Sequence, residues 1–246
     1  MDASGSHHSN QRYYDAFAAG YERLRGHNDP GGYHEMLDEL ESEYVARFGS
    51  GKDVLEVGCG TGLVLQRIKA FARSARGVDL SPGMLEKARA RELDVSLASA
   101  TALPFEDETF DVTCSFKVLA HVPEIELALS EMARVTRPGG YVLAELYNPH
   151  SLRALIKRFG PAGSIAHGAH EKDVYLRFDS PARAKQLTPA SCEHIGARGI
   201  RILTPTAHLM RIPVVRGGLC RLEHWLCDSP LRVFGGFYVA AYRKRG

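Results

Sequence analysis

The chain has 246 residues, of which 44% are hydrophobic, and its 31 basic residues nearly balance 29 acidic ones to give a formal net charge of +2. This composition supplies enough apolar material for a sizeable core and excludes a disordered chain. The near balance of charge argues against a large nucleic-acid interface. No apolar run approaches the roughly 18 residues of a membrane span, and the N-terminus has no apolar signal region. We therefore expect a cytoplasmic protein with neither nucleic acid nor membrane as a partner.

Two helices are predicted before the first strand. Apolar and aromatic residues, Tyr21 among them, recur at steps of three and four over residues 11–25 and again over residues 33–48. The glycine- and proline-rich segment GHNDPGG separates the two stripes. We assign residues 1–48 to an N-terminal helical cap.

Strands and helices then alternate strictly over residues 49–147. The five predicted strands cover residues 53–58, 75–80, 94–99, 110–116 and 139–147. Helices are predicted to begin near Leu63, at Ser81 with Pro82 in the first turn, and at Glu124. This alternation predicts right-handed βαβ units and a doubly wound, mostly parallel sheet with helices on both faces.

The regular pattern ends after Tyr147. Several prolines and glycines interrupt residues 148–190, which we interpret as a lid inserted over the carboxyl edge of the sheet. In the last unit, residues 191–246, the pattern predicts a helix at 188–197 and strands at 200–206 and 237–243. These two strands would bring the sheet to seven.

A cluster of glycines, GCGTG, stands where the first strand ends. Gly58 and Gly60 permit positive φ and lack a Cβ atom, so a ligand can touch the main chain there. The spacing is G-x-G-x-G, which is neither the dinucleotide-binding G-x-G-x-x-G nor a Walker motif. The preceding Glu56 would repel a diphosphate, so a cationic or zwitterionic ligand is favoured. The alternative is a tight turn with no ligand.

Asp79 ends the second strand in the segment GVDLSP. A carboxylate at this place can accept two hydrogen bonds from a ribose diol, as acidic residues do in nucleoside-binding α/β folds. The alternative is a helix cap, a role that Ser81 fills better. We expect Asp79 to bind ribose if the glycine-rich turn binds a ligand.

Four segments in order, VLEVGCGTG, GVDLSPGMLEKAR, ALPFEDETFDVTCSFKVLAHV and RVTRPGGYVLAELY, resemble the class I S-adenosylmethionine-dependent methyltransferases of the type 11 small-molecule group. The resemblance is strong over residues 13–147. It implies a Rossmann-like methyltransferase fold, S-adenosylmethionine as cofactor and S-adenosylhomocysteine as its product.

The resemblance also implies the cofactor site. The glycines would lie under the methionine and ribose, Leu80 and Met84 would flank the adenine, and Tyr21 would fold over the cofactor. Ser99 stands where relatives often carry an acidic residue for the adenine amino group. The predicted cofactor-binding residues are Tyr21, Glu56, Gly58, Cys59, Gly60, Gly62, Asp79, Leu80, Met84, Ala100, Thr101 and Phe116.

Methyl transfer needs alignment of the reacting atoms and often a base. His121 follows the fourth strand and Glu145 ends the fifth; related sugar and natural-product O-methyltransferases implicate such a pair in catalysis. We predict these two as catalytic, with a structural role as the alternative for each. Lys117 could contact an anionic substrate, although a solvated lysine is the expected state.

The predicted function is methylation of a small molecule, at a hydroxyl or enol oxygen, with a place in natural-product biosynthesis. The alternatives are methylation at nitrogen or carbon, an RNA or protein methyltransferase, and a cofactor-binding protein that does not methylate. No metal site is predicted, because Cys220, His224 and Cys227 lack the paired spacing of zinc ligands, and the five cysteines show no disulfide pattern.

Overall fold

In the computed structural model, residues 20–21, 32–152, 154, 175–204, 210 and 212–246 are described, and all structural statements below concern these residues. The helices are α3 (Tyr33–Gly49), α4 (Leu63–Lys69), α5 (Pro82–Ala90), α6 (Ile125–Val135), α8 (Pro181–Gln186) and α9 (Pro213–Leu226), with short 3-10 turns η1 (Leu119–His121) and η4 (Pro230–Phe234). The strands are β1 (Asp53–Val57), β2 (Ser74–Asp79), β3 (Asp94–Leu97), β4 (Phe110–Ser115), β5 (Thr136–Tyr147), β6 (Cys192–Ile200) and β7 (Phe237–Lys244).

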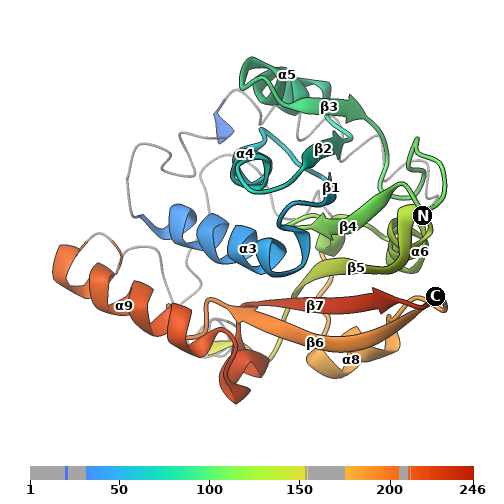
Figure 1. The fold of residues 1–246 in the computed structure, drawn as a ribbon. Helices are drawn as coiled ribbons and strands as arrows, with labels where there is room; N and C mark the ends of the chain where they lie inside the picture. Colours follow the sequence, from blue (N-terminus) through green and yellow to red (C-terminus); the bar gives the residue numbers. More distant parts are fainter. Residues whose placement is uncertain (1–19, 22–31, 153, 155–174, 205–209, 211) are drawn as a thin grey trace.

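The seven strands form one sheet in the order β3-β2-β1-β4-β5-β7-β6 (Figure 1). Strands β1 to β5 pair in parallel, while β7 runs antiparallel between β5 and β6. The predicted seven-stranded, mostly parallel fold is therefore confirmed. The chain winds outward from β1 to β3 and then resumes at β4 on the other side of β1, so the switch point of the topology lies between β1 and β4.

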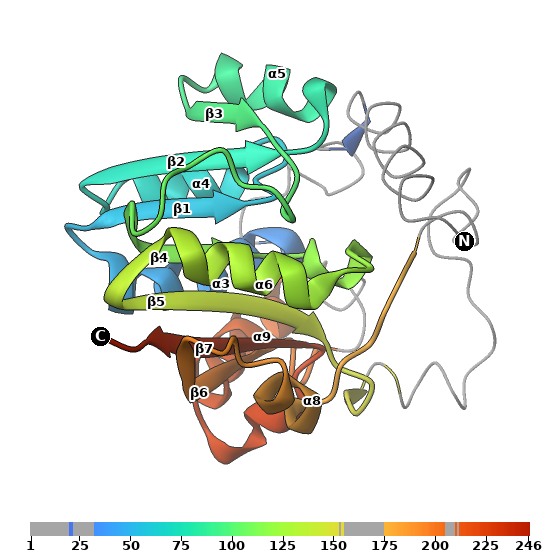
Figure 2. The same cartoon turned by 90° about the vertical axis from the view of Figure 1, so that its right-hand side faces the viewer.

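Helices cover both faces of the sheet (Figures 1 and 2). On one face, α3 and α4 pack with α9 over apolar side chains such as Val54, Val112 and Val239. On the other face, α6 and α8 cover a second cluster that includes Leu55 and Tyr242, both completely buried. The predicted helices on both faces thus correspond to a sheet that is buried on both sides, with near-continuous apolar strands.

Local sequence signals set most boundaries as predicted. The side-chain oxygen of Ser81 accepts a hydrogen bond from the main-chain N–H of Met84 and so caps α5, whose first turn contains Pro82. The same arrangement recurs in α8, which Ser180 caps ahead of Pro181. Helix α8 was not predicted. The N-terminal helix predicted over residues 11–25, apart from residues 20–21, and about half of the predicted lid lie outside the described residues.

The prediction for residues 188–204 was wrong. Residues 192–200 form strand β6 where a helix was predicted over 188–197. The strand predicted over 200–206 shares only Ile200 with β6, which ends before Arg201 with its φ of 64°, and residues 205–206 lie outside the described residues. Pairing with β7 overrides the weak local preference of this small-residue segment. A bulge between His194 and Gly196 also breaks the alternation by which a strand is recognised.

Segments distant in the sequence meet on the face that α3 covers. The buried Arg198 of β6 donates a hydrogen bond to the main-chain oxygen of Leu40 in α3 at 2.8 Å and forms an ion pair with Asp228 at 2.8 Å. Asp228 also pairs with Arg47 of α3. These contacts attach α3, which precedes the sheet in the sequence, to the edge strand β6 and to the segment after α9.

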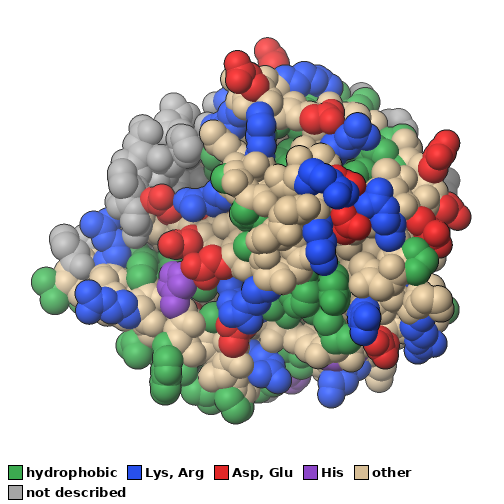
Figure 3. All heavy atoms as spheres, in the orientation of Figure 1, with side chains coloured by type: hydrophobic (Ala, Val, Ile, Leu, Met, Phe, Trp, Pro, Cys, Tyr) green, Lys and Arg blue, Asp and Glu red, His purple; other side chains and the backbone are tan. Residues whose placement is uncertain are grey.

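The surface carries no dominant charge on the face that Figure 3 shows, where basic and acidic side chains are interspersed. This mixture agrees with the small net charge of the chain. Each helix within the described residues is too short or too polar to cross a bilayer.

Glu223 is predicted to be essential for the stability of the C-terminal half. Its fully buried carboxylate, on α9, accepts hydrogen bonds from the N–H groups of Ile202, Leu203 and Thr204 and from the hydroxyl of Thr204, all within 2.9 Å. Glu223→Ala would leave these donors without an acceptor. We expect a loss of about 3 kcal/mol in the free energy of unfolding, measured by urea denaturation followed by circular dichroism.

The matched control is Glu193→Ala, at an exposed position of β6, which should change the stability by less than about 0.5 kcal/mol. Equal stability of the two variants would contradict the role given to Glu223.

Candidate functional site

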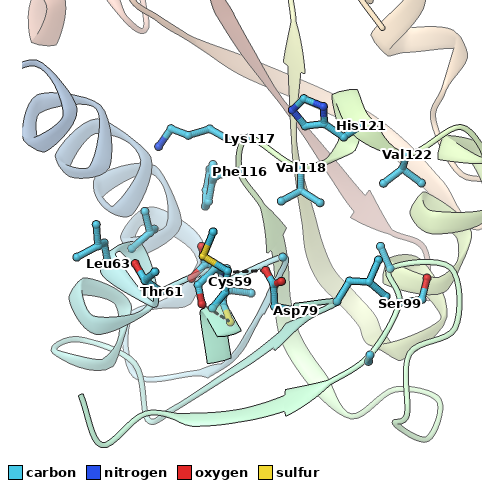
Figure 4. Close-up of a pocket in the computed structure, with 18 of the residues that line it drawn as sticks. Cys59, Thr61, Leu63, Asp79, Ser99, Phe116, Lys117, Val118, His121 and Val122 are labelled. Atoms are coloured by element: carbon cyan, nitrogen blue, oxygen red, sulfur yellow. Dashed lines mark hydrogen bonds between the residues drawn. The ribbon is translucent and has the colours of Figure 1, made fainter. Parts of the chain in front are cut away.

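A pocket opens at the carboxyl ends of the parallel strands, at the switch point of the sheet. Its walls come from Tyr21, the β1–α4 turn, the ends of β2 and β3, and the segment after β4 (Figure 4). The described residues that line it are Tyr21, Glu56, Gly58, Cys59, Gly60, Thr61, Leu63, Val64, Asp79, Leu80, Met84, Ala98, Ser99, Ala100, Phe116, Lys117, Val118, His121 and Val122. Of the predicted site residues, Gly62, Thr101 and Glu145 are not among them.

Gly58 and Gly60 of the β1–α4 turn require glycine for different physical reasons. Gly58 has φ of 79°, and a Cβ atom there would lie 2.2 Å from a methyl carbon of Val118. Gly60 has φ of 54°, but a Cβ atom there would meet no atom of the described residues within 4 Å. Gly58 therefore serves close packing against the neighbouring segment, whereas the main chain at Gly60 is left bare toward open space.

Asp79 joins the end of β2 to this turn. One carboxylate oxygen accepts a hydrogen bond from the N–H of Gly60 at 2.8 Å, and the other accepts from the N–H of Ser81 at 2.9 Å (Figure 4). A carboxylate has about four acceptor sites, so it can accept more hydrogen bonds than these two. The side chain thus fixes the turn and presents a negative charge to the pocket.

Glu56 supplies a second acidic group from β1. The residue is 2% exposed, and its Oε2 atom has no hydrogen-bond partner among the described residues. Burial raises the pKa of Glu56, and the neighbouring Glu41 raises it further. A buried acceptor without a donor is costly, so a cationic or donor group in the pocket would stabilise it.

The opposite wall of the pocket is largely apolar. Leu80 and Met84 line it from the β2–α5 segment, and Ala98 and Ala100 line it from the segment after β3. The hydroxyl of Ser99 lies 2.8 Å from that of Thr101 and accepts a hydrogen bond from the N–H of Thr101. Thr101 therefore contributes by orienting Ser99 and not by lining the pocket.

His121 lies at the rim, in η1. Its Nδ1 atom is 3.0 Å from the main-chain oxygen of Tyr175, and its ring packs edge-on against Tyr147 at 5.9 Å between centroids. Burial lowers the pKa of His121 below its ordinary value, although the hydrogen bond with Tyr175 opposes this. The lowered pKa favours the neutral imidazole, and in the tautomer with a proton on Nδ1 this atom donates to the carbonyl oxygen of Tyr175.

Glu145 lies beneath the pocket and has different partners from His121. It is 1% exposed, and its Oε1 atom accepts a hydrogen bond from the main-chain N–H of Lys117 at 3.0 Å. Burial raises its pKa, as does the nearby Glu41. The structure thus connects Glu145 to the pocket through Lys117.

The expectation that Lys117 is a solvated lysine was wrong. Its ammonium group lies 3.0 Å from a carboxylate oxygen of Asp38 and 2.7 Å from one of Glu41, both on α3, and its side chain is only 18% exposed. Neither acid was recognised in the sequence. Their positions three apart on the buried face of a helix were the available signal, because acids there need a cationic or hydrogen-bonding partner.

Outside the pocket, one group of three potential metal ligands occurs among the described residues: Glu39, Glu43 and His224, at the surface between α3 and α9. The Nε2 atom of His224 lies 3.4 Å from a carboxylate oxygen of Glu43, and its Nδ1 atom is 2.8 Å from the main-chain oxygen of Cys220. Arg198 also pairs with Glu43 at 3.5 Å. We interpret these contacts as a helix–helix ion-pair group.

Comparison with known families gives this pocket a context. Residues 55–144 match the model of a family described as a methyltransferase domain. A malonyl-acyl-carrier-protein O-methyltransferase of Erwinia billingiae is 32% identical over 166 residues, which cover 62% of this chain and 66% of the relative. A demethylmenaquinone methyltransferase of Mycobacterium bovis is 34% identical over 157 residues, or 63% and 61% of the two chains. The chain thus spans less than two thirds of the length of these relatives.

Solved structures share the fold over nearly the whole chain. A methyltransferase of Thermotoga maritima, described as a possible histamine N-methyltransferase, has a TM-score of 0.65 at 21% identity and covers 94% of this chain and 98% of its own. A Haloferax volcanii protein, described as a putative methyltransferase and solved with the activator Trm112, has a TM-score of 0.66 at 20% identity, covering 95% and 98%. A 4+2 cyclase, SpnF, has a TM-score of 0.63 at 20% identity, covering 96% and 95%.

The family match covers the glycine turn, Asp79 and the strands that form the pocket. The two curated relatives are methyltransferases by their names, and residues 55–144 of this chain match a methyltransferase domain.

Proposed function

We propose that the chain binds S-adenosylmethionine in this pocket and methylates a small molecule, at a hydroxyl or enol oxygen. The observation that carries the proposal is the bare main chain at Gly60, held by Asp79 next to a buried acid, Glu56, that has an oxygen without a described partner. The two acids and the exposed main chain suit a ligand with a diol at one end and a cationic amino group at the other.

The described residues fit this cofactor in three respects. Asp79 retains acceptor capacity for the ribose diol, the apolar side chains of Leu80 and Met84 offer a surface for a flat base, and Glu56 offers an acceptor to an ammonium group. Tyr21 lines the pocket as well, so the N-terminal segment contributes to it. Cys59, just after β1, and Phe116, just after β4, complete the proposed set of residues that contact the cofactor.

When bound, S-adenosylmethionine supplies a methyl group on a sulfonium, which a nucleophile attacks in line. The protein has to hold the acceptor in this line and to remove its proton. His121 is the proposed base, because burial lowers its pKa and its ring is held by the Tyr175 carbonyl oxygen and by Tyr147. Glu145 takes part through the main chain of Lys117, which it holds.

The histidine at the rim supports an oxygen acceptor, because a hydroxyl or enol has to give its proton to a base. The alternatives are nitrogen and carbon acceptors, which need a base less or need one of a different strength. The test is methyl transfer to a panel of phenols, enols, sugars and amines, measured as formation of S-adenosylhomocysteine. Tight cofactor binding without turnover on any acceptor would favour the alternative of a cofactor-binding protein that does not methylate.

Gly60 and Gly58 provide a matched pair of variants. Gly60→Ala should cost only the strain of a positive φ, about 1 kcal/mol of stability, but should weaken S-adenosylmethionine binding at least tenfold because the new methyl group enters the pocket. Gly58→Ala should destabilise the fold by more, about 2–3 kcal/mol, because Val118 has to move. Calorimetric titration and urea denaturation measure the two effects. Unchanged cofactor affinity in Gly60→Ala would place the ligand elsewhere.

Asp79→Asn should weaken cofactor binding at least tenfold, since the amide retains one acceptor oxygen and loses the charge. The cofactor analogue with a 2′-deoxyribose should distinguish the variant from the original chain: its affinity should fall in the original chain and change little further in Asp79→Asn. Equal losses in both proteins would remove Asp79 from the ribose site.

His121 gives a pH prediction. A base works in its neutral form, and the pKa of His121 lies below the ordinary value of 6.5. We therefore expect kcat/KM to be constant above neutrality and to fall as the pH drops through that lowered pKa. His121→Ala should lower kcat by about 100-fold and remove this dependence, while leaving cofactor affinity unchanged. A variant that keeps near-full activity with the same pH profile would show that another group removes the proton.

A further inference from the structure

Four carboxyl groups converge between α3 and the ends of β1 and β5, where Glu56 lines the pocket and the others lie behind it. They belong to Asp38, Glu41, Glu56 and Glu145, and each of these residues is at most 5% exposed. The Oε2 atoms of Glu56 and Glu145 have no hydrogen-bond partner among the described residues. Buried carboxylates that lie close together repel one another and cannot all be ionised without a cation.

Lys117 is the cation that the structure gives to this group of acids. Its ammonium group contacts Asp38 and Glu41, and its field opposes the rise in the pKa of both Glu56 and Glu145. Figure 4 shows that the side chain leaves the pocket wall and extends away from Asp79. The ammonium group of Lys117 therefore favours the ionised forms of Glu56 and Glu145.

The main chain of Lys117 is unusual as well. Its φ of 60° lies in the left-handed region, which a lysine occupies at a cost. The N–H group of this strained residue donates to Glu145, and its side chain is held by α3, so both ends of the residue are fixed. Strain of this kind persists only where surrounding contacts enforce it.

The strained residue connects directly to the pocket wall. Phe116 and Val118, its neighbours in sequence, both line the pocket, and the N–H of His121 donates to the main-chain oxygen of Val118 at 2.8 Å. A change in the backbone at Lys117 would move the apolar wall and the proposed base together. The acids of α3 and β5 thus act on the pocket through this one residue.

We propose that Lys117 is a positioning residue of the cofactor pocket, which clamps the segment after β4 to α3 and β5 and neutralises the acids beneath Glu56. This inference rests on the proposed function, because it takes S-adenosylmethionine as the ligand of the pocket. Lys117 itself need not touch the cofactor. It determines the shape of one pocket wall and the charge of the buried acids next to the pocket. Binding of a ligand that carries a sulfonium and an ammonium group depends on both.

The test separates the ammonium group from the backbone conformation. Lys117→Met removes the charge, Lys117→Arg keeps a cation, and Lys117→Asn keeps a residue that tolerates a left-handed φ. Titration calorimetry with S-adenosylmethionine and with S-adenosylhomocysteine gives the affinities of the full chain. We expect at least a tenfold loss of affinity for Lys117→Met, a loss of less than threefold for Lys117→Arg, and an intermediate loss for Lys117→Asn.

A double variant, which also changes Glu41 of α3, tests the charge balance. In Lys117→Met/Glu41→Gln one cation and one acid are removed together, so the affinity should recover to within about threefold of the original. In the single variant Lys117→Met the ammonium group is lost but all four acids, Asp38, Glu41, Glu56 and Glu145, remain. Together these acids should bind one extra proton. Binding of the cationic S-adenosylmethionine should release it, and this release is measured by titrating in buffers of different ionisation heat.

Lys117→Met should therefore release more protons on binding S-adenosylmethionine than the original chain does, and more than it releases on binding the uncharged thioether product. Lys52→Met, at an exposed lysine ahead of β1, is the control and should match the original chain. Proton release that is the same in Lys117→Met and in the original chain, or a double variant as weak as the single one, would overturn the proposal.

The outcomes distinguish this inference from the proposed function. An original chain that binds neither S-adenosylmethionine nor its product contradicts the proposed function itself. An original chain that binds both, with a Lys117→Met variant that also binds both equally well, contradicts only the role of Lys117. If Lys117→Met does not fold, the affinities of Lys117→Arg and Lys117→Asn are compared instead. Equal affinities of these two variants would overturn the role proposed for Lys117.

Discussion

The hydrogen bond from the N–H of Gly60 to the carboxylate of Asp79 is the contact on which the site depends. It joins the turn after β1 to the end of the neighbouring strand β2, and the same carboxylate also holds the first residue of the α5 cap, Ser81. Because β1 lies beside the switch point of the sheet, this bond determines the shape of the crevice there. Packing of Gly58 against Val118 then fixes the facing wall from β4.

Much of this arrangement could be predicted from local sequence, because local rules determine it. The glycines mark a turn with positive φ, Ser81 and Pro82 mark a helix start, and near-continuous apolar strands that alternate with helices mark a sheet covered on both faces. The convergence of Gly60 and Asp79 follows as well, since carboxyl ends of parallel strands meet at one edge. Each of these inferences uses information within a few residues of the feature predicted.

Features that depend on distant pairing could not be predicted in this way. Strand β6 is defined by its pairing with β7, and the bulge at Gly196 removes its regular alternation. Lys117 resembled a solvated lysine because its partners, Asp38 and Glu41, lie some 75 residues earlier in the chain. Glu145 was correctly placed at the end of a strand, but its connection to the pocket through the amide of Lys117 depends on a strained φ that the sequence does not reveal.

The attachment of α3 to the last part of the chain has a consequence for biosynthesis. Helix α3 packs on a face completed by β7, and the guanidinium group of Arg198 in β6 binds the main chain of Leu40. When α3 leaves the ribosome, the strands that cover its apolar side have not yet been translated. The apolar side of the nascent helix therefore stays uncovered until then, and the cooperative folding step can follow only after β7 has been synthesised.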